Sequence, residues 1–195
     1  MKMKTIYLVR HGQTLFNVQK KIQGFCDSPL TELGVAQAKI AGTYFKEVGI
    51  DLEEAHTSTS ERAIDTLQLI TELPFKTHKN LREWNFGTYE GEGEHLNPSL
   101  PYLDFFVQFG GESQEELSNR INKSITNIAT ESENNAILIV SHGAAIANFY
   151  RKWEDFSDVK RTSPIKNCSI MIYDYDGDVF KLREIVNHDF SSLEN

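Results

Sequence analysis

The chain has 195 residues and an ordinary globular composition, with 39% hydrophobic, 11% aromatic and 25% charged residues, which argues against a disordered, collagenous or coiled-coil protein. Its formal net charge of −8 argues against nucleic acid and anionic membranes as partners, because both are bound through a basic excess. Two cysteines, Cys26 and Cys168, are too few for a disulfide framework, and no stretch is apolar enough to span a bilayer. We therefore expect a cytoplasmic protein that folds as a single domain over residues 1–195.

Short apolar runs bounded by polar residues predict the strands, and continuous runs indicate strands buried on both faces. In chain order the expected strands are Thr5–Val9, Glu54–Thr57, Ala136–Val140, Ile170–Tyr175 and Val179–Ile185. The last two are expected to form a terminal hairpin, because Asp176-Gly177 between them favours a type I′ turn.

Helices are predicted between these strands from apolar residues at helical spacing and from capping residues. The expected helix starts are, in chain order, Thr31, the capping-box pair Ser58 and Glu61, the capping-box pair Ser113 and Glu116, and Gly143. Gly49 is expected to end the first of these helices.

Strands that alternate with helices predict an α/β fold with a mostly parallel central sheet. Helices then cover both faces, which gives a three-layer α/β/α architecture with the C-terminal hairpin at its end. The irregular stretch at about 88–112 contains clusters of glycine and proline and lies inside the fold. We expect it to be a lid-like insertion rather than a linker.

Arginines and histidines lie where predicted strands end. The first strand runs into Arg10-His11-Gly12, the strand at 136–140 runs into Ser141-His142-Gly143, and Arg62 lies in the first turn of a helix. Ligands of open α/β sheets bind at the carboxyl ends of the strands, so we expect these groups to meet at one edge. The glycine after each histidine is expected to allow close approach of the backbone to a ligand.

Such a cluster has a definite chemistry. Guanidinium groups bind phosphoryl oxygens in bidentate fashion, and an imidazole can act as a nucleophile or a cationic clamp near neutral pH. The pattern therefore predicts a phosphoryl-transfer site that needs neither a metal nor another cofactor.

Five sequence blocks resemble the signatures of the histidine phosphatase superfamily, the phosphoglycerate-mutase-like proteins. In chain order they are Leu8–Asn17, Gln23–Gly34, Ser58–Thr66, Leu81–Gly91 and Val140–Gly143. Five blocks in the family's order are far more specific than an isolated Arg-His-Gly tripeptide.

The resemblance implies roles for the matching residues. His11 would be the nucleophile that becomes phosphorylated, and Glu83 would protonate the leaving alkoxide and then activate water. The residues that would bind the phosphoryl group and offset the charge on its oxygens are Arg10, Arg62 and His142. The residues that would line the phosphate and substrate pocket are Asn17, Gln23, Gly24 and Gly143.

The segment after Glu83 bears on the choice between phosphatase and mutase. A bisphosphoglycerate-dependent mutase must hold doubly phosphorylated ligands and keep water away from its phosphohistidine. No Lys or Arg lies between Arg82 and Arg120, and the interval is rich in Asp and Glu, so an acidic lid is expected to repel a second phosphate. We therefore favour the phosphatase branch, a metal-independent phosphomonoester hydrolase.

Two other hypotheses remain at this point. One is a bisphosphoglycerate-dependent phosphoglycerate mutase. The other is a non-catalytic module that binds a phosphorylated ligand, although such a module would need neither His11 nor Glu83.

Some properties stay open. Aromatic residues of the lid-like segment, among them Tyr102 and Phe106, fit either core packing or an apolar rim for bulky leaving groups. The sequence predicts a small-molecule phosphomonoester as substrate without identifying it, and it leaves a homodimer open.

Overall fold

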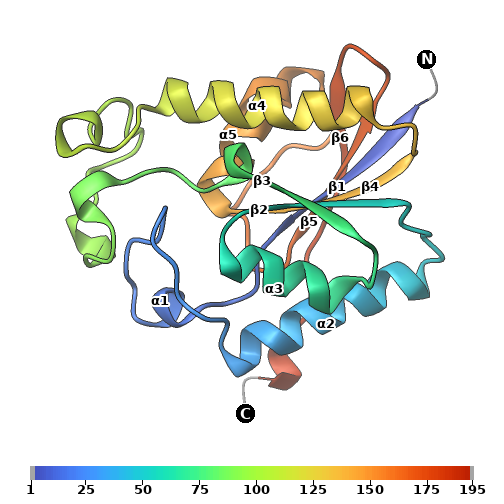
Figure 1. The fold of residues 1–195 in the computed structure, drawn as a ribbon, viewed down its shortest axis with the longest axis horizontal. Coiled ribbons are helices and arrows are strands. Elements are labelled where there is room, and N and C mark those ends of the chain that lie inside the picture. The colour runs from blue at the N-terminus through green and yellow to red at the C-terminus, as the bar shows by residue number, and fades with distance from the viewer. Residues whose placement is uncertain (1–2, 194–195) are drawn as a thin grey trace.

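The computed structural model describes residues 3–193 as a six-stranded sheet between two layers of helices (Figure 1). The strands are β1 (Lys4–Arg10), β2 (Glu54–Ser58), β3 (Phe75–His78), β4 (Ala136–Ser141), β5 (Ile170–Tyr175) and β6 (Phe180–Val186), in the order β3-β2-β4-β1-β5-β6. The first four in this order run parallel to one another. Strand β5 is antiparallel to its neighbour β1, and β6 is antiparallel to β5. The predicted mostly parallel sheet with a C-terminal hairpin is confirmed.

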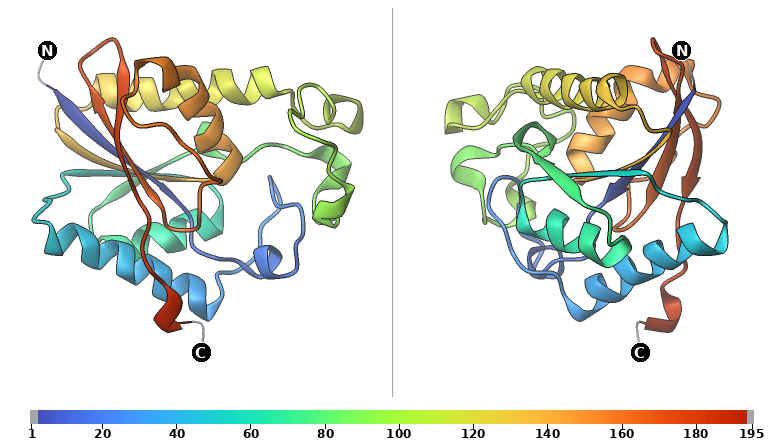
Figure 2. Two further views of the ribbon diagram at one scale, coloured as in Figure 1. Left: turned by 180° about the vertical axis from the view of Figure 1, so that it is seen from behind. Right: turned by 45° about the vertical axis from the view of Figure 1, so that its right-hand side comes forward.

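Two long helices cover each face of the sheet. The helices α2 (Glu32–Glu47) and α3 (Glu61–Ile70) lie on one face, and α4 (Gln114–Glu131) and α5 (Gly143–Trp153) lie on the other (Figure 2). Side chains of a strand alternate between the faces. Ile6 and Leu8 of β1 therefore join the core shared with α4 and α5, whereas Tyr7 and Val9 join the core shared with α2 and α3. The predicted three-layer α/β/α architecture is confirmed.

The two predicted capping boxes have different outcomes. Ser113 and Glu116 form the box at the start of α4, with both reciprocal hydrogen bonds present. The box of Ser58 and Glu61 is wrong, because β2 continues through Ser58 and the N-cap of α3 is Ser60. The hydroxyl of Ser58 instead accepts a hydrogen bond from the Ser60 backbone N–H.

Two elements and one turn differ from the sequence prediction. The sequence pattern misses β3 and the four-residue helix α1 (Leu15–Val18), because such short elements do not establish a period. The hairpin turn is not type I′, since that turn needs positive φ at both central residues and only Gly177 has it, at 115°. The Asp176 carboxylate stabilises the turn by accepting hydrogen bonds from the backbone N–H groups of Asp178 and Val179.

The segment at 88–112 has short 3₁₀ turns and is anchored by an aromatic side chain. Phe106 is 0% exposed and packs in edge-to-face contact with Trp84, Phe86 and Tyr102. Tyr102 also lines the pocket described below, together with Leu100. Of the two interpretations of these aromatic residues, core packing is therefore confirmed for Phe106, whereas Tyr102 lies at the pocket.

The strand order places the carboxyl ends of the central strands side by side. Arg10 is the register partner of Ser141 at the end of the β1–β4 ladder, and β2 pairs with the other edge of β4. The loop around α1 and the segment at 88–112 gather at this end of the sheet, on the left in Figure 1. Residues that follow β1 and β4 therefore meet beneath these loops.

Candidate active site

The two predicted histidines lie next to each other at the carboxyl ends of β1 and β4. Their ring centroids are 5.3 Å apart, and both side chains are buried. The backbone holds this arrangement, because His11 N donates to Ser141 O at 3.0 Å. The Asn167 side chain adds a hydrogen bond to His11 O at 3.0 Å.

The contacts of His11 leave one ring nitrogen available for nucleophilic attack. Its Nδ1 lies 2.8 Å from Gly12 O, and since a carbonyl oxygen only accepts, Nδ1 carries the proton and Nε2 has a free lone pair. Burial lowers the pKa of His11 well below its usual value of 6.5, and the positive charges of Arg62 and Arg10 lower it further. His11 is therefore a neutral imidazole near pH 7.

Arg62 is a fully buried cation at this site. Its side chain is 0% exposed, and its Nη1 donates to Cys26 O at 3.0 Å and to Asp27 Oδ1 at 2.8 Å. Its Nη2 donates to Gly24 O at 2.9 Å. Among the residues described, no acceptor is found for its Nε. The guanidinium is thus fixed on one side and keeps a donor for an anion.

Arg10 and His142 complete the cluster of donors. Arg10 Nη1 donates to Ile165 O at 2.6 Å, and its Nε has no acceptor in the described structure. Burial, with the charge of Arg62 next in importance, lowers the pKa of His142 well below its usual value. A neutral His142 can offer an anion a hydrogen bond but not the positive charge that a cationic clamp requires.

The Glu83 carboxylate lines the pocket and lies against the first turn of α5. Its Oε1 accepts hydrogen bonds from Trp84 N at 2.9 Å and Ala145 N at 2.8 Å, and its Oε2 accepts one from Ala144 N at 2.8 Å. The first-turn N–H groups of a helix need such acceptors. These bonds fix the orientation of a carboxylate that is only 7% exposed.

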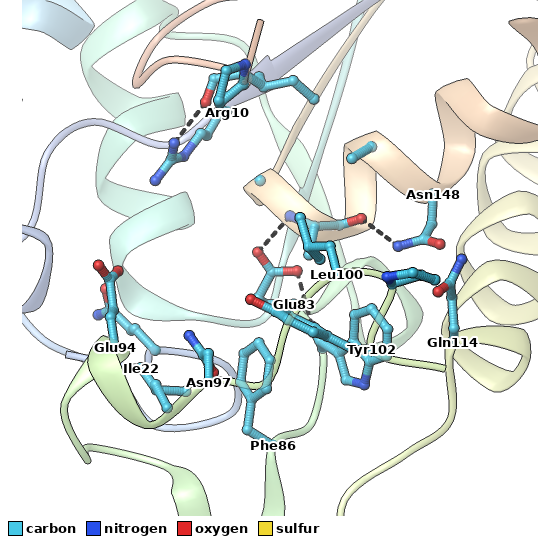
Figure 3. Close-up of a pocket in the computed structure, with 18 of the residues that line it drawn as sticks. Arg10, Ile22, Glu83, Phe86, Glu94, Asn97, Leu100, Tyr102, Gln114 and Asn148 are labelled. Atoms are coloured by element: carbon cyan, nitrogen blue, oxygen red, sulfur yellow. Dashed lines mark hydrogen bonds between the residues drawn. The ribbon is translucent and has the colours of Figure 1, made fainter. Parts of the chain in front are cut away.

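Most of the predicted site residues border a single pocket of about 570 Å³ (Figure 3). Those that line it are Arg10, His11, Asn17, Gln23, Glu83 and Gly143. The other three, Gly24, Arg62 and His142, are buried and are not part of its lining. Figure 3 shows Glu83 between Arg10 on one side and Asn148 on the other.

Asn17 and Gln23 are tied into the loop around α1. Asn17 Oδ1 accepts from Thr14 N and from Asn167 Nδ2, each at 3.2 Å. Gln23 accepts from Thr14 Oγ1 at 2.7 Å and donates to Ser28 Oγ at 2.9 Å. The amide of Asn17 therefore keeps donors for a ligand, whereas both ends of the Gln23 amide are used within the loop.

Glycine is required at Gly12 and Gly24 by backbone packing and not by a ligand. A Cβ on Gly12 would lie 2.5 Å from Gly34 O, and one on Gly24 would lie 1.9 Å from Trp84 O. A Cβ on Gly143 would lie 3.5 Å from its nearest neighbour, which is an ordinary contact. The expectation that these glycines admit a close ligand is therefore wrong for Gly12, whose close neighbour is the backbone of Gly34.

Glu90 is a structural residue of the site that sequence reasoning missed. Its carboxylate accepts four backbone hydrogen bonds of 2.7–3.0 Å, from Gly24, Phe25, Cys26 and Phe86. The same segment, 24–26, presents two carbonyl oxygens to Arg62. Glu90 thus positions Arg62 indirectly, and its place in the Glu90-Gly91 part of the family block was the only signal for it.

Arg120 has a comparable role for Glu83. Its guanidinium donates to the backbone carbonyl groups of Arg82 and Glu83, each at 2.6 Å, and to the carboxylate of Glu112. Arg120 comes from α4, so this contact fixes the backbone of the proposed acid/base residue against the helical layer. Nothing in the sequence pattern indicated it.

Residues 3–193 contain neither a metal-binding cluster of side chains nor a membrane-spanning helix. No cluster of three or more His, Cys, Asp or Glu side chains there is arranged to hold a metal ion. Nor does this part of the chain contain a helix with the length and apolar character needed to cross a membrane.

Comparison with known proteins identifies the family. The model of the histidine phosphatase superfamily (branch 1) matches residues 6–188. Phosphoglycerate mutase-like protein 4 of Arabidopsis thaliana is 30% identical over 205 residues, which cover 97% of this chain and 86% of that protein.

Two solved structures are also similar. A phosphoglycerate mutase from Bacillus anthracis str. Sterne has a TM-score of 0.83 at 28% identity, over 94% of this chain and 92% of the other. A phosphoserine phosphatase from Entamoeba histolytica, in complex with 3-phosphoglyceric acid, has a TM-score of 0.78 at 26% identity, over 95% and 98%.

The chain belongs to the histidine phosphatase superfamily, branch 1. The resemblance of its five sequence blocks is thereby confirmed. Because the relatives carry the names of both mutases and phosphatases, membership does not by itself select the acceptor of the phosphoryl group.

We expect His11 to remain neutral at about pH 6, because its pKa is held well below 6.5. An ordinary imidazole would be about three-quarters protonated at that pH. The Cε1–Hε1 NMR signal of His11, assigned with a His11→Gln variant, should keep its neutral chemical shift from about pH 7.5 down to pH 6. A titration midpoint at or above 6.5 would contradict a buried neutral nucleophile.

Replacing Glu90 with Gln should destabilise the protein and weaken binding of inorganic phosphate. The amide nitrogen cannot accept hydrogen bonds, so about half of the four backbone donors lose their acceptor, which lowers the free energy of unfolding by about 2–4 kcal/mol. The matched control is Glu92→Gln, since the Glu92 side chain is exposed, and it should change this free energy by less than about 0.5 kcal/mol. Equal urea midpoints for the two variants would refute the role of Glu90.

Proposed function

We propose that the protein is a phosphomonoester hydrolase that works through a phosphohistidine on His11. The observation that carries this proposal is the arrangement of His11, which has a free Nε2, is acted on by the charges of Arg62 and Arg10, and lines one pocket with Glu83. A nucleophile, charge-stabilising donors and one acid/base group are the parts that a two-step displacement needs.

The first step transfers the phosphoryl group to the protein. His11 Nε2 attacks phosphorus, and the bond from phosphorus to the ester oxygen breaks. Protonated Glu83 gives its proton to that oxygen, so that a neutral alcohol leaves. Arg10 and Arg62 stabilise the negative charge on the equatorial oxygens, and the buried His142 donates a hydrogen bond to them.

The second step returns the site to its starting state. Glu83, now a carboxylate, takes a proton from a water molecule as the water oxygen attacks phosphorus. The N–P bond breaks, inorganic phosphate leaves, and His11 is again neutral. One carboxyl group therefore serves as acid and then as base, which suits the fixed orientation that the start of α5 gives Glu83.

Two observations support water as the acceptor. The segment at 88–112 contributes no Lys or Arg to the pocket, so that its further cations, Lys21, Arg151 and Arg161, come from other segments. Leu100, which borders the pocket, is 76% exposed. The charge argument from the sequence is nevertheless weaker than expected. Of the acidic residues in that segment only Glu94 lines the pocket, since Glu90 faces the backbone of 24–26 and Glu112 pairs with Arg120.

The proposed roles predict distinct kinetic defects, measured in EDTA because no metal is required. His11→Ala should lower kcat/KM for an aryl phosphate by at least about 10³-fold, and His95→Ala, which removes an exposed imidazole, should leave it unchanged. Glu83→Gln should lower kcat/KM for an alkyl phosphate by about 10²–10⁴-fold, and by much less for 4-nitrophenyl phosphate, whose leaving group needs little protonation. A His11→Ala protein with the original rate would refute the mechanism.

Hydrolase and mutase activities can be separated on one substrate. With 3-phosphoglycerate, ³¹P NMR should show inorganic phosphate as the product and no accumulation of 2-phosphoglycerate, with or without added bisphosphoglycerate. Isomerisation faster than phosphate release would favour the mutase instead.

A further inference from the structure

We propose that the pocket holds a second anion, and that the substrate is a phosphomonoester whose leaving group has a flat apolar body and ends in an anionic group. This inference rests on the proposed function and adds the class of leaving group. The groups that would bind the distal anion are the guanidinium groups of Arg151 and Arg161, which both line the pocket.

The face of α5 sets the direction of the pocket. Ala144, Ala147, Asn148 and Arg151 all line it, and their spacing of three and four residues places them on one side of the helix. Ala144 N binds the Glu83 carboxylate at one end. Because a helix rises 1.5 Å per residue, Arg151 begins about 10 Å further along the axis.

Arg151 and Arg161 meet this face from two segments. Arg151 Nη1 donates to Asn148 Oδ1 at 2.8 Å. Arg161 follows α5 in the chain, and its backbone N–H donates to the hydroxyl of Tyr150 at 3.0 Å while its Nη1 donates to Ser163 O at 2.8 Å. The pocket lining thus includes two guanidinium groups whose hydrogen bonds go only to neutral acceptors.

Neither guanidinium is neutralised within residues 3–193. The ion pairs found there do not include Arg151 or Arg161. Glu94, the acidic residue of the pocket besides Glu83, lies on the opposite side of Glu83 from Asn148 (Figure 3). Both guanidinium groups are therefore without an ion pair in this part of the chain, although Asp104 and Glu115 share an adjacent hollow with Arg151 and the chain as a whole carries a charge of −8.

The middle of the pocket suits an apolar group. Besides the two alanines of α5, its apolar lining residues include Trp84, Leu100, Pro101 and Tyr102. Volumes of a few hundred Å³ are typical of pockets that enclose most of a ligand, and this one has about 570 Å³. An aromatic ring fits between small side chains and aromatic edges.

A test substrate needs an apolar body between its phosphate and its distal anion. Four bonds separate phosphorus from the carboxylate carbon in 3-phosphoglycerate, which spans about 5 Å when extended and has no apolar body. In 3-(4-phosphonooxyphenyl)propanoate the same separation is about 9 Å and includes an aromatic ring. The second compound therefore has the three parts that the proposal requires.

The test compares this propanoate with its neutral amide as substrates, since the two differ only in the distal charge. The wild-type protein should prefer the carboxylate by about tenfold in kcat/KM, the size expected for a charge-assisted hydrogen bond. Arg151→Gln and Arg161→Gln should each bring this ratio close to one. Arg151→Lys, which keeps the charge, should retain most of it.

Lys152→Gln is the matched control, because Lys152 is the neighbouring exposed cation on α5 but does not line the pocket. It should keep the wild-type ratio. A wild-type ratio of one, or a ratio that survives both Arg→Gln changes, would overturn the distal site. Asp104 and Glu115 border an adjacent hollow with Arg151, and the second of these results would indicate that Arg151 serves that surface. Failure to hydrolyse either compound while 4-nitrophenyl phosphate is hydrolysed would overturn the distal site alone, whereas failure with all three would overturn the proposed function itself.

Discussion

The buried positive charge of Arg62 constrains the site more than any other single interaction. Its guanidinium is removed from water and is fixed by two backbone carbonyl groups and by Asp27. Together with burial, this charge keeps His11 and His142 neutral. The fold has therefore already removed the guanidinium from water and fixed its position. A phosphoryl group bound near it would be stabilised by this charge without the free-energy cost of reorienting or desolvating the side chain. In the proposed mechanism, burial and the Arg62 charge together account for both the neutral nucleophile and the binding of the phosphoryl group.

Helix α5 lines the pocket from Glu83, the proposed acid/base residue, to the arginine proposed to bind the leaving group. Its first turn orients Glu83 through two backbone N–H groups, and its side face continues to Arg151. The proposed nucleophile lies at the sheet edge, whereas α5, the loop at 20–23 and the segment at 88–112 line the rest of the pocket. Substrate choice is expected to depend on these flanking elements, because functional loops on a rigid scaffold set specificity.

The sheet and its reactive edge could be predicted from the sequence because each depends on local pattern. Continuous apolar strands run directly into His11 and His142, and parallel pairing then brings their ends together. Glu83 has no such local mark, and only the family resemblance singled it out. The convergence of Arg151 and Arg161 on the pocket could not be predicted, since it depends on how α5 packs against the segment that follows it. The direction of side chains also could not be predicted, so the charge of the acidic segment overstated the negative charge at the pocket. Glu90, for example, accepts hydrogen bonds from the backbone and does not line the pocket.

Phosphoryl transfer through His11 is tested most directly by the stereochemical course at phosphorus. An aryl thiophosphate ester that is chiral through ¹⁶O and ¹⁸O labels would be hydrolysed in ¹⁷O-labelled water, and the configuration of the released inorganic thiophosphate determined. Two successive in-line displacements, on His11 and then on water, predict overall retention of configuration. Inversion would show a single displacement by water and would contradict the phosphohistidine intermediate.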